Sequence, residues 1–233
     1  MTPKYADYDK ETKVSIIKTV RSLTHIDFIF ISTKEVYIHC GRRKLLSRAL
    51  DFDRNRPIDY FFWIDSDVWF DPDDVSNLIA LCENKHLVTG LYFSRHSLRN
   101  PMVCFGDSRN GYQWSLPKNW QSSPFKVDGC GFGFVMMSRK MVHDYIRAYP
   151  STEWFQSKEW YPSNGHPDAA KWVVGEDLHF CKNSSKIGYP VWCHPRIILQ
   201  HKGIGLKDYL NVDKNPKPHC EVEVEILKMR NIL

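Results

Sequence analysis

The sequence lacks any apolar stretch near the roughly 18 residues that a membrane-spanning helix needs, so it predicts no integral membrane segment. Its first residues, Met1 to Tyr5, also lack the apolar run of a signal peptide. The seven cysteines form no C-x-x-C pair, which counts against a zinc ribbon or a redox dithiol. Their odd number and wide spacing favour free thiols in a reducing compartment. We therefore expect a cytoplasmic protein, with peripheral membrane association left open.

Blocks of like charge are also missing. The formal net charge of +5 comes from 32 basic and 27 acidic residues spread along the chain. This mild excess suits an anionic small molecule as well as it suits nucleic acid, and a plain role in solubility is at least as common. Of these partners we expect the anionic small molecule and no nucleic acid. With 233 residues, 42% of them hydrophobic and 25% charged, the chain is long enough to bury a full core, and one compact domain is the default.

The most informative segment is an apolar run that ends in two aspartates. Residues 60–64 are all apolar or aromatic, and Asp65-Ser66-Asp67 follows directly. A strand that is apolar on both faces belongs inside a sheet covered by helices, and its C-terminal tip is where open α/β sheets place ligands. Two carboxylates at that tip are costly to bury without a partner. The segment therefore predicts a site for one hard cation, although solvated strand-end residues are the simpler alternative.

The pattern along the first half of the chain alternates helices and strands, which predicts an α/β sheet with parallel strands. The predicted helices lie at 13–23, at 41–50 and after Asp71, an expected N-cap followed by Pro72, and the predicted strands at 25–32, 60–64 and 87–93.

The second half is less regular, and it contains a glycine-rich strand at 125–137 whose alternating glycines indicate a close approach to the backbone. A long aromatic loop at 150–170 has the length of a substrate loop. The other predicted elements are short strands at 102–105 and 112–114, a helix at 139–149, a helix that opens at Glu176, and strands at 190–193 and 197–200.

Two more places carry candidate chemistry. Glu176 and Asp177 open a helix, where acids that stabilise the helix dipole are common. His201 follows an apolar strand, where a hydrogen-bonded core histidine is the better interpretation when it is taken alone. Their order and spacing relative to Asp65 and Asp67 favour a functional role for all of them.

In this order the motifs resemble those of a GT-A type glycosyltransferase, a nucleotide-sugar-dependent enzyme with a single α/β domain and a divalent metal. Asp65-Ser66-Asp67 matches the DxD motif of that family, and Gly175-Glu176-Asp177 resembles the acidic motif that opens its acceptor-side helix. Residues 128–131, Asp-Gly-Cys-Gly, resemble its glycine-rich sugar wall, and His201 matches its late metal-binding histidine. Residues 41–46 resemble the start of a helix near the nucleotide.

The resemblance implies a Rossmann-like, mixed and mostly parallel sheet flanked by helices over residues 1–205, with 206–233 as a C-terminal linker and docking segment. It implies a sugar transfer from a nucleoside-diphosphate sugar to a hydroxyl of a glycan, lipid or protein acceptor, with inversion inferred from Glu176 and Asp177. The cofactor would be Mn²⁺ or Mg²⁺, because carboxylate oxygens favour hard cations and an imidazole tilts the choice toward Mn²⁺.

Individual roles follow from the same resemblance. Asp177 is the expected base, which takes the proton of the acceptor hydroxyl, and Glu176 orients the acceptor or the base. The expected metal ligands are Asp65, Asp67 and His201; the expected nucleotide contacts are Thr2, Pro3, Tyr5, Arg42 and Ser66; the expected sugar contacts are Asp128, Gly129, Gly131 and Trp172.

The sequence departs from the family at two places. Residues 2–5 already resemble the nucleotide loop that follows the family's first strand. The chain therefore starts late, is a fragment, or opens its sheet differently. Arg43 stands where an asparagine is common.

Two other classes stay open. A phosphohydrolase of the haloacid dehalogenase type also has an apolar strand that ends in Asp-x-Asp, with Asp65 as nucleophile and Asp67 as general acid. About sixty residues precede the motif here, whereas in that class it lies near the chain start, and a later lysine is not evident. A non-catalytic carbohydrate-binding domain is the other alternative. An EF-hand calcium loop is excluded because Phe70 occupies the position that needs glycine.

Overall fold

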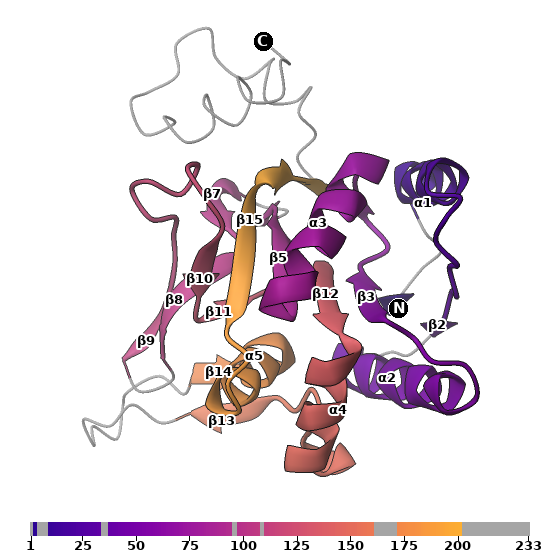
Figure 1. Cartoon of the computed structure of the whole chain (residues 1–233). Coiled ribbons are helices and arrows are strands. Elements are labelled where there is room, and N and C mark those ends of the chain that lie inside the picture. Colours follow the sequence, from indigo (N-terminus) through magenta and orange to yellow (C-terminus); the bar gives the residue numbers. More distant parts are fainter. Residues whose placement is uncertain are drawn as a thin grey trace, which may run out of the picture.

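A five-stranded mixed sheet with helices on both faces forms the centre of the molecule (Figure 1). This computed structural model describes residues 2–3, 9–33, 37–94, 97–107, 110–160 and 172–201. The α/β class predicted from the sequence is confirmed. The strands in spatial order are β10 (Phe125–Val127), β15 (Val191–Ile198), β5 (Leu87–Leu91), β12 (Phe134–Ser138) and β3 (Tyr60–Ile64).

The sheet is mixed because β12 lies between β3 and β5 and runs antiparallel to both. Three strands, β3, β5 and β15, point the same way, but only β5 and β15 are parallel neighbours. The predicted mixed sheet is thus confirmed, whereas the expectation of mostly parallel strand pairs was wrong. β10 is antiparallel to β15 at the edge. The C-terminal ends of β3, β5 and β15 and the N-terminal end of β12 therefore lie together. We call this end of the strands the C-terminal edge of the sheet.

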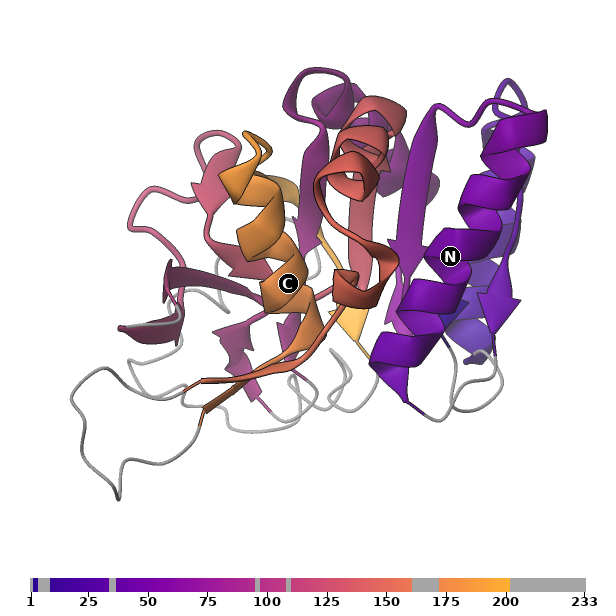
Figure 2. The same ribbon diagram turned by 90° about the horizontal axis from the view of Figure 1, so that it is seen from below.

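Two layers of helices cover the sheet. Side chains of α1 (Lys10–Ser22) and α3 (Pro72–Lys85) pack in one cluster with one face of the sheet. The other face carries α2 (Ile38–Asn55), α4 (Arg139–Ala148) and α5 (Glu176–Lys186), which lie side by side in Figure 2.

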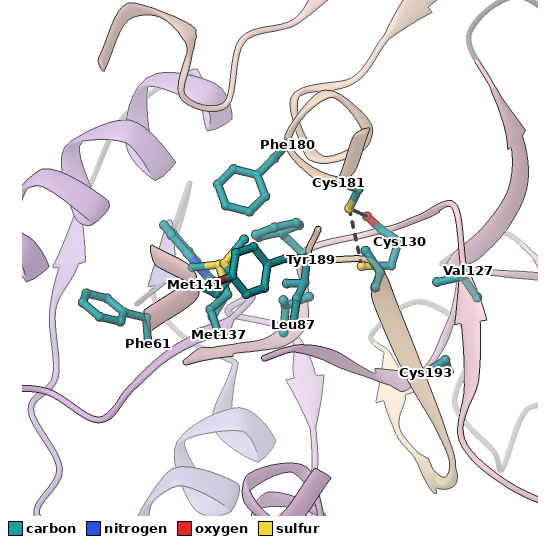
Figure 3. Packing of buried hydrophobic residues seen from close by; sticks show 14 of the residues in the cluster. Phe61, Leu87, Val127, Cys130, Met137, Met141, Phe180, Cys181, Tyr189 and Cys193 are labelled. Carbon is teal, nitrogen blue, oxygen red and sulfur yellow. Dashed lines mark hydrogen bonds between the residues drawn. The ribbon is translucent and has the colours of Figure 1, made fainter. Parts of the chain in front are cut away.

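Strand β3 shows why the chain forms two apolar layers. Phe61 and Trp63 are buried in the cluster under α2, α4 and α5, whereas Phe62 and Ile64 pack toward α3. This alternation of side chains confirms that the strand is apolar on both faces. Figure 3 shows Phe61 and other buried residues of the sheet in the same apolar cluster as Met141 of α4 and Phe180 of α5.

The remaining strands form small ribbons around the central sheet. The predicted short strands of the middle region are confirmed, since β8 (Val103–Asp107) and β9 (Gly111–Trp114) form a hairpin and β11 (Gly129–Cys130) pairs with β8. A short 3-10 turn lies at Ser151–Glu153. The other paired strands are β1 (Thr2–Pro3) with β2 (Ser32–Thr33), β4 (Val68–Trp69) with β16 (Gln200–His201), β6 (Phe93–Ser94) with β7 (Ser97–Pro101), and β13 (Lys158–Trp160) with β14 (Trp172–Val174).

One strand prediction was wrong, and two other predicted strands form a single strand. Residues 25–31 form no strand, and Phe30 keeps 57% of its surface exposed. An apolar run forms a strand only where a partner edge accepts its backbone hydrogen bonds. The strands predicted at 190–193 and 197–200 are joined in β15, with a register shift between His194 and Ile198. Pro195 lies inside that irregular stretch, where a residue without an N–H is tolerated.

Several sequence predictions fall partly or wholly outside the described residues. They concern Tyr5, the second half of the long loop (161–170), Cys220 and the C-terminal segment at 206–233. The six described cysteines are free thiols and five of them are buried, as expected for small core residues. Among the described residues, no helix is long and apolar enough to cross a membrane.

Gly129 allows the first turn of α5 to pack against β11. A Cβ atom at this position would lie 2.4 Å from Leu178 Cδ2 and 3.0 Å from Cys104 Sγ. We expect Gly129→Ala to lower the free energy of unfolding by about 1–3 kcal/mol, because a well-packed core resists an extra methyl group. Urea denaturation measures the change. In a double-mutant cycle with Leu178→Ala, the two costs should be less than additive, and strict additivity would contradict this contact.

Candidate functional site

The motifs singled out in the sequence gather at the sheet edge where β3, β5 and β15 end. Asp65 follows β3 directly, and its N–H donates to the Gly133 carbonyl at 3.0 Å, just before β12. His201 lies in β16, after β15, and pairs with Val68 of β4. This is the position that open α/β sheets use for ligands, as the sequence predicted.

Arg42 connects two of these motifs. It lies in the first part of α2, and its guanidinium is 2.6 Å from Glu176 Oε1 and 3.5 Å from Asp65 Oδ1. Only 2% of Arg42 is exposed, and the guanidinium also lies over the Phe132 ring, 5.4 Å from its centroid. One buried cation therefore bridges the first aspartate of the DxD triplet and the acidic start of α5.

The charges of this bridge depend on each other. Burial lowers the pKa of Arg42, but the carboxylates of Asp65, Glu176 and Asp177 outweigh this effect and leave the pKa raised. Burial raises the pKa of Asp65 despite the nearby guanidinium, and the charge of Asp67 raises it further. Asp65 Oδ1 accepts no hydrogen bond from the described residues. The site therefore favours a cation close to Asp65.

Asp67 faces His201 rather than Arg42. His201 Nε2 lies 3.5 Å from Asp67 Oδ2, and His201 Nδ1 lies 2.9 Å from the Phe93 carbonyl. A carbonyl only accepts hydrogen bonds, so Nδ1 must carry the proton, and in a neutral ring Nε2 keeps its lone pair on the side of Asp67. A hydrogen bond that fixes the far ring nitrogen is the arrangement typical of metal-ligating histidines.

The donor set of Asp67 and His201 fits a hard or borderline divalent cation. Among the residues that the structure describes, no three His, Cys, Asp or Glu side chains group closely enough to hold a metal ion by themselves. Mg²⁺ is usually bound by one or two carboxylates together with waters and substrate phosphates, not by a complete protein cage. One carboxylate and one imidazole, with Asp65 close in sequence, meet that lower requirement.

Asp177 lies at the start of α5 beside this bridge. The Leu178 N–H donates to Asp177 Oδ1 at 2.8 Å. Burial and the neighbouring charge of Glu176 raise the pKa of Asp177 to about 6, although Arg42 pulls it down. A carboxyl group with such a pKa can accept a proton near neutral pH, as a general base must.

The raised pKa of Asp177 also predicts a stability change. The folded state holds this proton between pH 4 and 6 while the unfolded state has lost it, so Asp177 destabilises the fold increasingly as the pH rises through this window. We expect Asp177→Asn to unfold like the parent protein at pH 4 and to be more stable by roughly 2 kcal/mol at pH 7.5. Urea denaturation at both pH values tests this, and an equal effect at the two pH values would contradict it.

Tyr92 is a residue of this site that the sequence analysis missed. Its hydroxyl accepts the Gly133 N–H at 2.8 Å, and its ring packs edge-on against His201. A Cβ at Gly131 or Gly133 would lie within 2.7 Å of the Tyr92 hydroxyl, so only residues without a side chain leave room for Tyr92 here. The sequence signal for Tyr92 was its position near the end of the apolar run 87–93, where it is an aromatic residue with a polar hydroxyl.

The glycine pattern was thus correctly interpreted as a close approach to the backbone, but the approaching groups that the structure shows are protein side chains. Leu178 covers Gly129, and Tyr92 and Met102 cover Gly131. Asp128 is exposed, and its carboxylate accepts the Gly106 N–H at 2.7 Å. Their predicted contacts with sugars stay predictions.

The predicted nucleotide residues are spread more widely. Thr2 and Pro3 form β1, parallel to Ser32 and Thr33 of β2. Ser66 lies in the turn between the two aspartates, and its carbonyl accepts the Asp9 N–H at 2.9 Å. Trp172, a predicted sugar contact, begins β14 and pairs with Trp160. β1 contacts α2, the helix that carries Arg42, and Ser66 directly follows Asp65, whereas Tyr5 lies outside the described residues.

Comparisons with known proteins give no family. No protein-family model matches the chain, and no curated protein matches its sequence. Among solved structures, A197 from STIV is similar with 16% identity and a TM-score of 0.49, over 86% of this chain and 91% of that one. The structure of GalNAc-T7 with UDP, GalNAc and Mn2+ is similar with 10% identity and a TM-score of 0.48.

That likeness covers 97% of this chain but 41% of the GalNAc-T7 chain. A nucleoside-diphosphate-sugar pyrophosphorylase from Vibrio cholerae RC9 is similar with 13% identity and a TM-score of 0.40, over 87% of this chain and 75% of that one. At TM-scores below 0.5 these likenesses carry no argument about the site. The functional conclusion therefore rests on the residues themselves.

Proposed function

We propose that this chain is a metal-dependent glycosyltransferase that moves a sugar from a nucleoside diphosphate to an acceptor hydroxyl with inversion. The observation that carries the proposal is the convergence of three sequence motifs at one sheet edge. Arg42 bridges Asp65 to Glu176, and His201 faces Asp67. A nucleotide-sugar transferase needs a metal-binding carboxylate and a proton-accepting carboxylate in such proximity.

Asp67 and His201 would hold the cation, with Asp65 acting directly or through water. A bound Mn²⁺ or Mg²⁺ supplies neutralisation of the diphosphate charge as that group leaves. Arg42 holds Asp65 and Glu176 in position from the buried side. It contacts both carboxylates and is nearly inaccessible, so the geometry supports a positioning role for it more directly than a contact with the nucleotide.

Asp177 would take the proton from the acceptor hydroxyl. A hydroxyl is too weakly acidic to attack unaided at neutral pH, so removal of its proton during bond formation lowers the barrier. The pKa of Asp177, raised to about 6 by burial and Glu176, leaves the group ionised at neutral pH and more basic than an ordinary carboxylate. Glu176 is held by Arg42 and is available to orient the base rather than to replace it.

The haloacid dehalogenase alternative receives less support from this geometry. There Asp65 would attack phosphorus, which requires an accessible carboxylate. Here Asp65 Oδ1 is buried and lies 3.5 Å from Arg42, so only the other part of the carboxylate, in a side chain that is 22% exposed, could attack. Hydrolysis of a generic phosphomonoester by the purified protein, lost in Asp65→Asn, would favour this alternative. A protein that binds a nucleotide sugar but never turns it over would favour the carbohydrate-binding alternative.

A thermal-shift screen of nucleoside diphosphates and nucleotide sugars, with and without Mn²⁺, tests the proposed function. We expect at least one nucleotide to stabilise the chain only when Mn²⁺ is present, because binding to the folded state raises the melting temperature. In Asp67→Asn the affinity for that nucleotide with Mn²⁺ should fall by about 10–100-fold, measured by calorimetry. Unchanged affinity in Asp67→Asn would contradict the metal assignment. Asp73→Asn, at an exposed residue of α3, is the control.

A further inference from the structure

Helix α1 buries mainly hydroxyl side chains, with Ile16 its partly buried contact to the apolar cluster of α3 and the sheet. Its buried residues are Thr12, Ser15 and Thr19, whereas Val14 and Ile17 keep 42% and 49% of their surfaces exposed. A helix that packs on a globular body normally turns its apolar stripe inward. The hydroxyls of Thr12 and Thr19 have no hydrogen-bond partner among the described residues. The outward face of α1 therefore presents the apolar side chains that a partner would cover.

The same face is basic. At 100° per residue, Val14, Ile17 and Arg21 lie on one side of the helix, and Lys13 and Lys18 flank them. All three basic residues are exposed, and the only acid in α1 is Glu11. We call this set, with Val20 at its margin, the α1 outer face. A partner that fits it must combine apolar side chains with carboxylates.

The chain contains one segment of that composition beyond the described residues. Residues 221–227 read Glu-Val-Glu-Val-Glu-Ile-Leu, so each apolar residue from 222 to 226 has an acid next to it. The described part of the chain ends at His201, which pairs with Val68 of β4, and β4 contacts α1. About 19 residues link these points, a chain length that can span on the order of 25 Å.

We propose that residues 221–229 bind the α1 outer face within the same molecule. Val222 and Ile226 would cover Val14 and Ile17, while Glu223 and Glu225 would meet the flanking lysines. Tethering raises the local concentration of such a segment to the millimolar range, which allows a small contact to form without high intrinsic affinity. The proposal does not depend on the enzymatic activity, because it rests on α1 and on the C-terminal sequence alone.

Hydrogen–deuterium exchange of the full chain tests the contact. We expect the amides of residues 221–229 to exchange at least 10-fold more slowly than in a synthetic peptide of the same sequence. Ile17→Asp should abolish that protection. Phe52→Asp, which changes an equally exposed apolar residue on α2, should leave it intact. Lys18→Glu should weaken the protection, and adding Glu225→Lys should restore part of it.

Three outcomes would overturn the proposal. Exchange of residues 221–229 at the rate of the free peptide shows that no contact forms. Protection that disappears on dilution assigns the α1 outer face to a second copy of the chain. Protection of α1 that requires vesicles containing anionic lipid, and that persists after deletion of residues 221–233, assigns it to a membrane surface.

Discussion

Replacing Asp177 by asparagine is expected to lower the rate of sugar transfer by about 10²–10⁴-fold, the usual contribution of a general base. Nucleotide binding should stay within about twofold, because Asp177 contacts neither Asp67 nor His201 in any described interaction. The parent enzyme should lose activity as the pH falls through about 6, where Asp177 takes up a proton and can no longer accept one. Turnover of the donor found in the screen, followed against pH, measures both effects.

The matched control is Asp73→Asn. Asp73 is the second residue of α3, as Asp177 is of α5, but it is exposed. If Asp177→Asn transfers sugar at a near-normal rate, the base lies elsewhere, and Glu176 becomes the next candidate. If both variants lose activity equally, the effect comes from the helix start and not from the proton acceptor.

Arg42→Met is expected to lower the free energy of unfolding by about 3–5 kcal/mol at pH 8. Methionine fills a similar volume but leaves Asp65 and Glu176 buried without their cation, which is the costly outcome when one member of a buried ion pair is removed. The loss should shrink toward pH 5, because the stranded carboxylates can then take up protons. Urea denaturation at the two pH values measures the effect.

Arg54→Met in the same helix is the control for this change. Arg54 pairs with Asp51 on the surface, with 78% of its side chain exposed, and such pairs contribute about 0–1 kcal/mol. An Arg42→Met variant as stable as Arg54→Met would mean that water or another group already neutralises the carboxylates. Combining Arg42→Met with Glu176→Gln should recover part of the lost stability, since one of the two stranded charges is then absent.

Local pattern was sufficient wherever a segment is governed by its own neighbours. The consecutive apolar residues of β3 predict a buried strand, and Asp71 with Pro72 predicts the start of α3, where the Asp71 N–H donates to Asp74. The glycines of 129–133 predict a close backbone contact. These inferences depend on side-chain size, backbone freedom and hydrogen bonds over a few residues, all of which the sequence displays.

Pairing between distant segments could not be obtained in this way. Residues 25–31 have the composition of a strand and find no partner edge, whereas β12 inserts between two strands that precede it in the chain. Strand neighbours depend on which edge is free when the sheet assembles, and composition carries little information about that.

For the site, the sequence by itself determined that acids at 65, 67, 176 and 177 and a histidine at 201 follow strands or open a helix. Only the tertiary structure decided that Asp65 turns to Arg42, that Asp67 turns to His201, and that Tyr92 supports both His201 and the glycine-rich turn. The physical reason is that ion pairing and burial act over a few ångströms in space. Those short distances arise only after segments that are distant in the sequence, up to 134 residues apart for Asp67 and His201, have been brought together by the sheet.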